Sequence, residues 1–326
     1  MPRLFRALIF LIAPISLWGC QSVAPFNHTD PLAPQPVAVA PGVYYFEGST
    51  AAASPQNHGF VGNSGFIVGP TGVTVIDTGS SYQHGQSILA SIRRITNQPI
   101  RLVVITHARQ EFLFGNAAFA ELDVPILAHA DAAALMRVRC THCLENLTHV
   151  LGEEAMKNTR LVLPTQTIIA SKTIESGGRT LDIVTLNGAS APGDIAVFDR
   201  ASGVLFVGEW LVIHRLPMIQ DAHAQQWIAA LNQLPVPAVS AIIPGYGPAV
   251  QTQGHSEMVT AMTALQQYLM ALDAGVRNQM AAGVGLNDAT DAVTLPQFKA
   301  WGGYEDLQRL NVHYRYLQLE SAELLN

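Results

Sequence analysis

The sequence predicts a mixed α/β fold in two halves, each of which combines strands with helices. Residues 65–76 hold two apolar runs around a Gly-Pro-Thr-Gly turn, the pattern of two strands joined by a short connection. Residues 102–105 are four consecutive apolar residues, as expected of a strand that is buried on both faces. Residues 81–96 carry apolar side chains at helical spacing, and residues 181–243 repeat the same mixture of patterns.

The elements of the first half follow from the period of the apolar residues. Short apolar runs indicate strands, and a spacing of three to four indicates helices, as for Ile88, Ile92 and Ile95. In order, we expect strands at 43–47, 65–68 and 73–76, a helix at 81–96, a strand at 102–105, a short helix at 116–121, a strand at 125–128, and a helical stretch at 130–158 that is interrupted near Cys140 and Cys143.

The second half is expected to continue with strands near 181–186, 195–198, 204–207 and 239–243, and with a helix at 223–234. Beyond residue 250, apolar residues recur at spacings of three to four from Met258 to Met280, which indicates a long helix with one face towards the core. Residues 302–325 are expected to form a final helix. We therefore expect one folded domain at 42–326, with the helices of 254–326 packed on it.

The composition is that of a globular chain with a generous interior. Of 326 residues, 49% are hydrophobic and 13% are charged, which is enough for one large core or two half-domains. The formal net charge is −6 and no run of basic residues occurs. Nucleic acid is therefore disfavoured as a partner.

The N-terminus predicts export. Arg3 and Arg6 precede an apolar run that is too short to span a membrane, so residues 1–19 have the features of a signal peptide. The sequence Leu-Trp-Gly-Cys that ends at Cys20 resembles a bacterial lipobox, which implies lipidation of Cys20 and anchoring at the outer membrane, facing the periplasm. An ordinary cleaved signal with a fortuitous Cys20 is the alternative. Residues 20–41 contain five prolines and no apolar period, so we expect an extended tether.

The cysteines agree with export. Of the three, Cys140 and Cys143 remain once Cys20 is taken as the lipid carrier, and they form Cys-Thr-His-Cys. In an oxidising compartment we expect a local disulfide between them. A thioredoxin-like redox pair is an alternative, although this pair does not open a helix after a strand. A zinc site is another, although a fourth ligand is lacking nearby.

Five segments carry the functional signal. Residues 106–116, THARQEFLFGN, come directly after the strand at 102–105. The others are 63–79, which ends in Val-Ile-Asp-Thr-Gly, then 187–194, 204–209 and 242–248, which contain Gly-Asp, Gly-Glu and Pro-Gly-Tyr-Gly. In this order they resemble the loops of the metallo-β-lactamase superfamily, over most of the folded chain.

The resemblance implies a four-layer αβ/βα sandwich and a site for one or two zinc ions, which turn water into a nucleophile. In the superfamily these loops carry histidines and aspartates. Six residues of this chain stand at the metal-ligand positions: His107, Arg109, Glu111, Ser190, Glu209 and Tyr246. Among them, His107 alone matches the superfamily pattern.

The replacements oppose the ordinary zinc pair. Arg109 stays protonated and has no lone pair to offer, Ser190 is a poor ligand, and Tyr246 would have to lose its phenolic proton. We therefore expect no cofactor. Instead, we expect Arg109 to fill the vacated space and to pair with Glu111 or Glu209.

Two points stay open at the site. A rearranged mononuclear zinc site would use His107, Glu209 and a histidine from elsewhere, for which the sequence offers His58, His84 and His214. Asp77 lies beside the metal cavity according to the resemblance. The interpretation we favour for it is a partner of backbone N–H groups at the start of the next helix.

Three functions are compatible with these patterns. The first is a non-hydrolytic, envelope-anchored relative that binds a small molecule or a periplasmic protein in the old active-site cleft. The second is a hydrolase of an ester, thioester or lactam with a single metal or none, in which Glu111 or Glu209 acts as general base. The third is an accessory protein of a periplasmic quinoprotein dehydrogenase. It rests on residues 309–320, RLNVHYRYLQLE, which resemble the end of periplasmic quinoprotein-relay-type zinc metallohydrolases.

Overall fold

The computed structural model describes residues 34–232, 234–252 and 256–324. The predicted signal peptide at 1–19, the predicted lipidation site Cys20 and the first part of the predicted tether lie outside these residues. Within the described ranges, no helix combines the length and the apolar character that crossing a membrane requires.

The first sheet follows the chain order from β1 to β7. Its strands are β1 (Val37–Ala40), β2 (Val43–Phe46), β3 (Ser64–Gly69), β4 (Gly72–Ile76), β5 (Ile100–Val104), β6 (Ile126–His129) and β7 (Gln166–Ile168). Neighbours from β1 to β4 are antiparallel, and those from β4 to β7 are parallel. β1 lies inside the range 20–41 that was predicted as a tether. This part of it is a strand, because it pairs with β2 across the turn at Gly42.

The second sheet has the order β13-β12-β11-β10-β9-β8. Its strands are β8 (Lys172–Ser176), β9 (Arg179–Thr185), β10 (Ile195–Asp199), β11 (Val204–Phe206), β12 (Ala241–Ile243) and β13 (Val250–Gln251). β11 and β12 are parallel, and the other neighbours are antiparallel.

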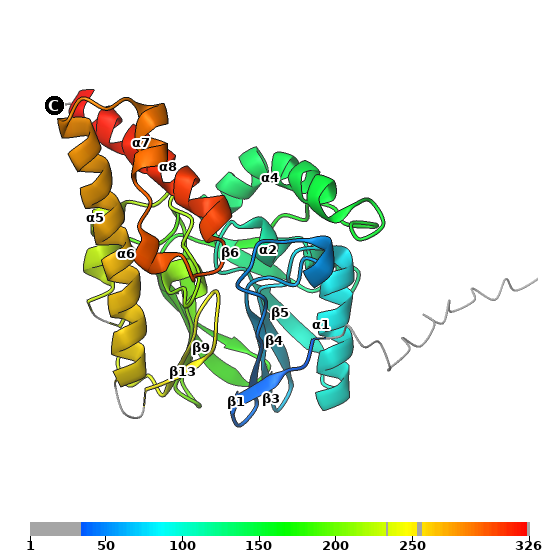
Figure 1. Ribbon diagram of the computed structural model, residues 1–326. Helices are drawn as coiled ribbons and strands as arrows, with labels where there is room; N and C mark the ends of the chain where they lie inside the picture. Colours follow the sequence, from blue (N-terminus) through cyan, green and yellow to red (C-terminus); the bar gives the residue numbers. More distant parts are fainter. Residues whose placement is uncertain (1–33, 233, 253–255, 325–326) are drawn as a thin grey trace, which may run out of the picture. The chain divides into compact units, whose positions relative to one another are not determined.

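The helices flank these sheets on their outer faces (Figure 1). They are α1 (Tyr82–Ile95), α2 (Gln110–Leu113), α3 (Asn116–Ala120), α4 (Ala130–Leu151), α5 (Ala224–Ala230), α6 (Ser256–Ala281), α7 (Leu286–Ala292) and α8 (Tyr304–Leu324). Three short 3-10 helices are also present in the described chain: η1 (Pro55–Asn57), η2 (Gly208–Trp210) and η3 (Pro296–Phe298).

Three apolar clusters separate four layers, which confirms the predicted αβ/βα sandwich. One cluster lies between the sheets, a second between the first sheet and α1, α3 and α4, and the third between the second sheet and α5, α6 and α8. β5 shows why its sequence has no alternation. Leu102 and Val104 belong to the cluster between the sheets, while Val103 belongs to the cluster under the helices.

α4 differs from the prediction in two ways. It runs without interruption through Cys140 and Cys143, because no glycine or proline occurs in it before Gly152, whose φ of 88° ends the helix. Both cysteines are free thiols, so the predicted disulfide is absent from this structure.

α6 and α8 pack against each other and cover the second sheet. Between them, Arg315 Nε donates to Asp273 Oδ1 at 2.7 Å, and Arg277 donates to the same carboxylate at 3.0 Å. Asn311 Nδ2 donates to Pro217 O at 2.7 Å and so ties α8 to the loop after η2. This contact places the first turns of α8 beside the loops that carry the candidate site.

Candidate functional site

The predicted site residues lie in loops at one end of the sheets. His107, Arg109 and Glu111 follow β5, Glu209 lies in η2 after β11, and Tyr246 follows β12. The carboxyl ends of parallel neighbours, such as β4 and β5 or β11 and β12, lie at the same edge of a sheet, and this edge is where α/β proteins bind their ligands. The loops from both sheets therefore converge as the sequence predicts.

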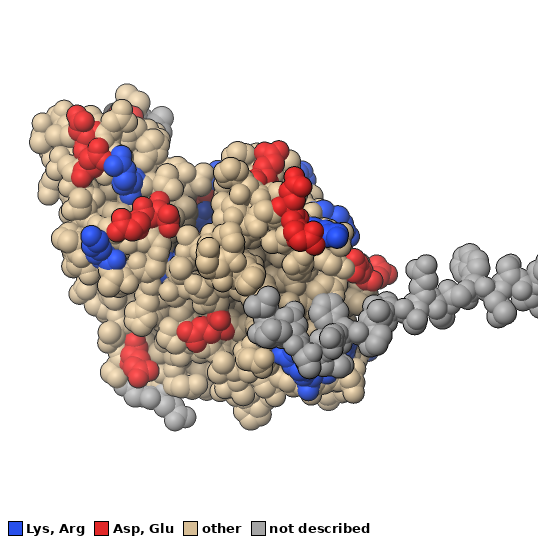
Figure 2. Space-filling model, turned by 45° about the vertical axis from the view of Figure 1, so that its right-hand side comes forward, with Lys and Arg blue, Asp and Glu red and all other residues tan. Residues whose placement is uncertain are grey.

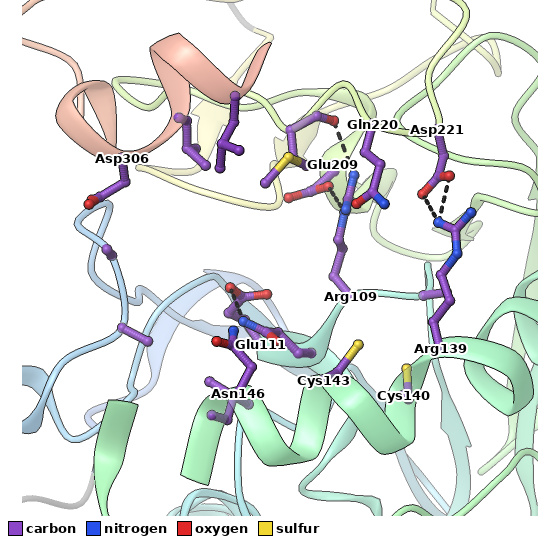
Figure 3. A pocket seen from close by; sticks show the side chains of 18 of the residues that line it. Arg109, Glu111, Arg139, Cys140, Cys143, Asn146, Glu209, Gln220, Asp221 and Asp306 are labelled. Carbon is purple, nitrogen blue, oxygen red and sulfur yellow. Dashed lines mark hydrogen bonds and ion pairs between the residues drawn. The ribbon is translucent and has the colours of Figure 1, made fainter. Parts of the chain in front are cut away.

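Arg109 and Glu209 form a buried ion pair. Arg109 Nε donates to Glu209 Oε2 at 2.9 Å, and the side chains are 13% and 4% exposed. Arg109 Nη2 also donates to Met218 O at 3.1 Å (Figure 3). The prediction that Arg109 pairs with one of two carboxylates is confirmed, and the partner is Glu209. Glu111 instead accepts from Gln110 Nε2 at 3.3 Å.

The ion pair keeps both partners charged. Burial alone would raise the pKa of Glu209, but the guanidinium of Arg109 more than offsets this and holds the pKa below its usual value. A general base near neutral pH needs a carboxylate whose pKa is raised. The ion pair therefore disfavours Glu209 in this role, and the general base stays a prediction.

His107 is neutral and shielded. Burial lowers its pKa to about 4, and its ring lies 4.2 Å from that of Phe112. Nδ1 lies 2.6 Å from Thr106 Oγ1, whereas Nε2 has no hydrogen-bond partner among the described residues. Thr106, which the sequence analysis did not single out, thereby positions the one ligand-type residue that matches the superfamily pattern.

Asp77 orients this loop and is not a helix cap. Its Oδ1 accepts from Thr106 N at 2.8 Å and its Oδ2 accepts from Thr106 Oγ1 at 2.7 Å. Asp77 has a φ of 57°, so the chain turns there and the carboxylate meets the loop after β5. Ser81 caps α1 in its place, accepting from His84 N. The interpretation of Asp77 as a helix partner is wrong, and burial raises its pKa to about 7.

Ser190 is held within its own loop by Asp194. Ser190 N and Oγ donate to Asp194 Oδ2 at 2.9 and 2.8 Å, and Ala191 N donates to the same oxygen at 3.1 Å. Burial raises the pKa of Asp194 to about 7, and its Oδ1 has no partner among the described residues. Asp194 was missed as a site residue, although the Gly-Asp that closes this segment is a signal for it.

Tyr246 contributes an aromatic ring to the candidate site. Asn63 Nδ2 donates to Pro244 O and Gly247 O, at 2.8 and 2.7 Å, and so holds the loop that carries Tyr246. The Arg215 guanidinium lies 4.4 Å from the centre of the Tyr246 ring. Burial keeps the pKa of Tyr246 well above its usual value, and its hydroxyl has no hydrogen-bond partner among the described residues.

Gly208 permits the close approach of these loops. A Cβ at this position would lie 2.6 Å from Thr106 Oγ1 and 2.9 Å from His107 Nδ1, and the φ of 52° is also one that glycine favours. A glycine here therefore lets η2 bring Glu209 against the loop after β5.

A cavity of about 830 Å³ opens above the ion pair. Six parts of the chain line it: Ala52 and Ala53, the loop after β5 with the start of α2, α4, residues 209–221, the loop after β12 and the first turns of α8. Arg109, Glu111, Glu209 and Tyr246 line it, whereas His107 does not. The polar residues that the sequence analysis missed here are Asn146, Gln220, Asp306 and the ion pair of Arg139 with Asp221. They lie on elements without any motif, so no sequence signal marked them.

The residues present do not fit a zinc site. Within the described residues, no three His, Cys, Asp or Glu side chains lie together in a way that would hold a metal. Of the histidines in the mononuclear alternative, His84 is buried against Phe60 with a ring distance of 4.1 Å, and His58 and His214 lie elsewhere outside the cavity lining. The positive group beside Glu209 in this structure is the guanidinium of Arg109.

The comparisons with known proteins agree with the geometry of the fold. The family model of the metallo-beta-lactamase superfamily matches residues 59–246. A linear primary-alkylsulfatase from Pseudomonas sp. is 21% identical over 230 residues, which are 60% of this chain and 43% of the relative. The chain thus spans less than half the length of this curated relative.

Solved structures resemble the chain at low sequence identity. A metallo-beta-lactamase from Pontibacter korlensis superposes with a TM-score of 0.56 at 19% identity, covering 72% of this chain and 99% of that chain. The sec-alkylsulfatase Pisa1 from Pseudomonas sp. superposes with a TM-score of 0.65 at 16% identity, covering 87% of this chain and 50% of that chain. At such identities the likeness concerns the fold alone.

Proposed function

The chain belongs to the metallo-β-lactamase superfamily, and because a buried ion pair joins Arg109 to Glu209, we propose that it binds a small amphiphilic molecule without zinc chemistry. The protein would be a ligand-binding relative of these hydrolases, held in the cell envelope through Cys20. Its ligand would enter the cavity above Arg109 and Glu209.

The ion pair of Arg109 with Glu209 carries this proposal. A guanidinium about 4 Å from a zinc ion would be repelled by roughly 8 kcal/mol at an effective dielectric constant of about 20. A structural zinc site binds with about 10–16 kcal/mol, so the repulsion would cancel most of that binding. Glu209, which stands at one of the predicted metal-ligand positions, already has a cationic partner at 2.9 Å.

The lining of the cavity supports an amphiphile. Arg109 and Glu209 bring charged groups to the cavity, and α4 and α8 contribute aliphatic side chains to its wall beside Asn146 and Asp306. These are Leu135, Leu147, Val150, Leu307 and Leu310, and Leu216 and Met218 continue the apolar surface. Two relatives are named for alkyl sulfates, which join an apolar chain to a charged head. We propose that the ligand shares this plan, with its chain along α4 and α8.

Calorimetry with octyl sulfate tests the proposal on the purified protein. We expect saturable binding of octyl sulfate and none of inorganic sulfate, because the apolar chain supplies the binding energy. Leu310→Asp places a charge on the cavity wall and should weaken binding by about tenfold or more, which corresponds to 1.4 kcal/mol.

Leu317→Asp is the matched control. Leu317 lies on the same helix and is 37% exposed, compared with 41% for Leu310, but it does not line the cavity. This variant should bind octyl sulfate as the wild type does. Equal losses in both variants, or hydrolysis that depends on a stoichiometric metal, would contradict the proposal.

A further inference from the structure

We propose that Cys140 and Cys143 form a redox-active dithiol, which exchanges with a low-molecular-weight disulfide that enters the cavity. Both residues line the cavity, and Figure 3 shows their sulfur atoms directed from α4 towards Arg109 and Arg139. The inference goes beyond the proposed ligand binding and does not depend on it.

The helix places the two sulfur atoms within bonding range. Residues three apart in an α-helix lie on the same face, with Cα atoms about 5 Å apart by helix geometry. A disulfide needs a Cα separation of about 4.4–6.8 Å, which this spacing meets. Its Cβ separation of about 3.5–4.5 Å is shorter than the roughly 5–6 Å of an ideal helix, so closure requires this turn of α4 to tighten locally. The structure holds the reduced form, with both cysteines as thiols.

The two thiols have unequal surroundings. Cys140 is 1% exposed and packs in the cluster under the first sheet, whereas Cys143 is partly exposed. Hydrogen bonding to the Cys140 thiol lowers the pKa of Cys143 to about 7, a shift that burial and Glu111 oppose and Arg109 supports. The same contact and burial raise the pKa of Cys140. Cys143 is therefore the attacking thiol, and Cys140 the resolving one.

The reaction balances with a disulfide as the oxidant. The Cys143 thiolate attacks one sulfur of the incoming disulfide, a mixed disulfide forms, and the first thiolate leaves and takes up a proton. Cys140 then loses its proton and attacks the sulfur of Cys143. The intrahelical disulfide forms and the second thiolate leaves. The protein dithiol loses two electrons and two protons, and the small disulfide becomes two thiols.

A metal explains the pair less well than redox chemistry does. His142 lies between the cysteines in sequence, but its side chain is 89% exposed and lies 3.4 Å from Glu145. Among the described residues, no third ligand-type side chain completes a group with the two thiols. Arg139 and Arg109 favour ionisation of the Cys140 thiol and would oppose a bound cation, whereas Glu111 raises the pKa of Cys143 and Arg109 lowers it.

Oxidised glutathione is the probe for the experiment, which uses the full chain. We expect the wild type to convert to an intrahelical disulfide, and Cys140→Ser to accumulate a glutathione adduct on Cys143. Cys143→Ser should form an adduct on Cys140 about tenfold or more slowly, because the buried thiol is rarely ionised. Fragment mass spectra assign each adduct and separate it from Cys20.

A second measurement keeps both cysteines and follows the ionisation of Cys143. The rate of Cys143 alkylation by iodoacetamide in the wild type should rise to half its maximum near pH 7. Arg109→Gln should move this midpoint to higher pH, and Glu111→Gln should move it to lower pH. A wild type that remains a dithiol in excess oxidised glutathione would overturn the proposal. So would equal adduct rates in the two cysteine variants, or a Cys143 midpoint at the ordinary thiol value.

Discussion

Arg109 Nε lies 2.9 Å from Glu209 Oε2, so two side chains that are 100 positions apart in the chain form one buried ion pair. In the superfamily pattern these positions belong to a histidine and an aspartate that hold zinc. Here a positive side chain neutralises the carboxylate, and the pair lies among the loops that follow β5 and β11. Figure 2 shows few charges on the molecular face that it presents, with both signs interspersed.

Removing one member of the ion pair should destabilise the fold far more than replacing both members with apolar side chains. Arg109→Met leaves Glu209 charged and buried without a partner, so we expect a loss of about 3–5 kcal/mol in the free energy of unfolding. The double variant Arg109→Met with Glu209→Leu removes the stranded charge and should lose much less. Denaturant titrations of both variants measure the difference.

An exposed pair is the control for that cycle. Arg200 donates to Asp182 at 2.7 Å on the surface, so Arg200→Met should change the denaturation midpoint little. An Arg109→Met variant as stable as the wild type would contradict the role assigned to the buried pair.

Asp77 should give stability a measurable pH dependence. Burial raises its pKa in the folded protein to about 7, against 3.8 for the unfolded chain. Its contribution is therefore fully present below about pH 3.8 and is lost as the pH rises through 7, because the folded state binds the extra proton. Asp77→Asn cannot titrate. Relative to the wild type, its free energy of unfolding should rise with pH by up to about 1.4 kcal/mol per unit.

For Asp182→Asn, the free energy of unfolding relative to the wild type should change with pH in the opposite direction. The hydrogen bond from Arg200 lowers the pKa of Asp182, so its contribution is present at high pH and is lost as the pH falls. Denaturation at several pH values compares the two variants. His84 and His107, whose pKa values burial lowers, are present in all three proteins and cancel in the differences.

The zinc content of the protein should depend on which residues occupy the predicted metal-ligand positions. We expect little zinc in the protein purified without chelators, and an unfolding temperature that does not change on dialysis against EDTA. The triple variant Arg109→His, Ser190→His, Tyr246→His restores imidazoles at three ligand positions and should recover some metal. Elemental analysis of both proteins decides the matter, and stoichiometric zinc in the wild type would refute the expectation.

Two substitutions of Tyr246 should separate the contribution of its ring to stability from the contribution of its hydroxyl to ligand binding. Its ring packs edge-on against Phe112 at 5.4 Å and under Arg215, so Tyr246→Ala should cost about 3–5 kcal/mol of stability. Tyr246→Phe keeps the ring and removes only a hydroxyl without a protein partner. It should leave the unfolding temperature unchanged and weaken octyl sulfate binding. Tighter binding by Tyr246→Phe would show that the hydroxyl does not face the ligand.

The fold was predictable because its signals are local. The unalternating run of β5 indicated a strand buried on both faces, and the apolar spacing in α1 indicated one buried helix face. β1 was missed because a strand at the edge of a sheet needs few apolar residues, and its neighbours are prolines. The break expected in α4 rested on the cysteines, which do not break helices.

The sequence predicted where the site residues lie but not which side chains hydrogen-bond to one another. The motif spacing brought His107, Arg109, Glu209 and Tyr246 to one end of the sheets, because parallel strands present their following loops at the same edge. Nothing in the sequence indicated that Asp77 would bind Thr106 or that Asp194 would hold Ser190. Those contacts depend on how the backbone turns at Asp77 and around the Gly-Asp loop.

The amino-acid order thus determined the layers, the family and the loss of imidazoles from the metal positions, because each is written in neighbouring residues. Only the folded arrangement decided that Arg109 takes Glu209 rather than Glu111, and that α4 and α8 enclose a cavity beside them. Ion pairs, pKa values and cavities depend on distances between segments far apart in the chain. Packing of the whole domain sets those distances.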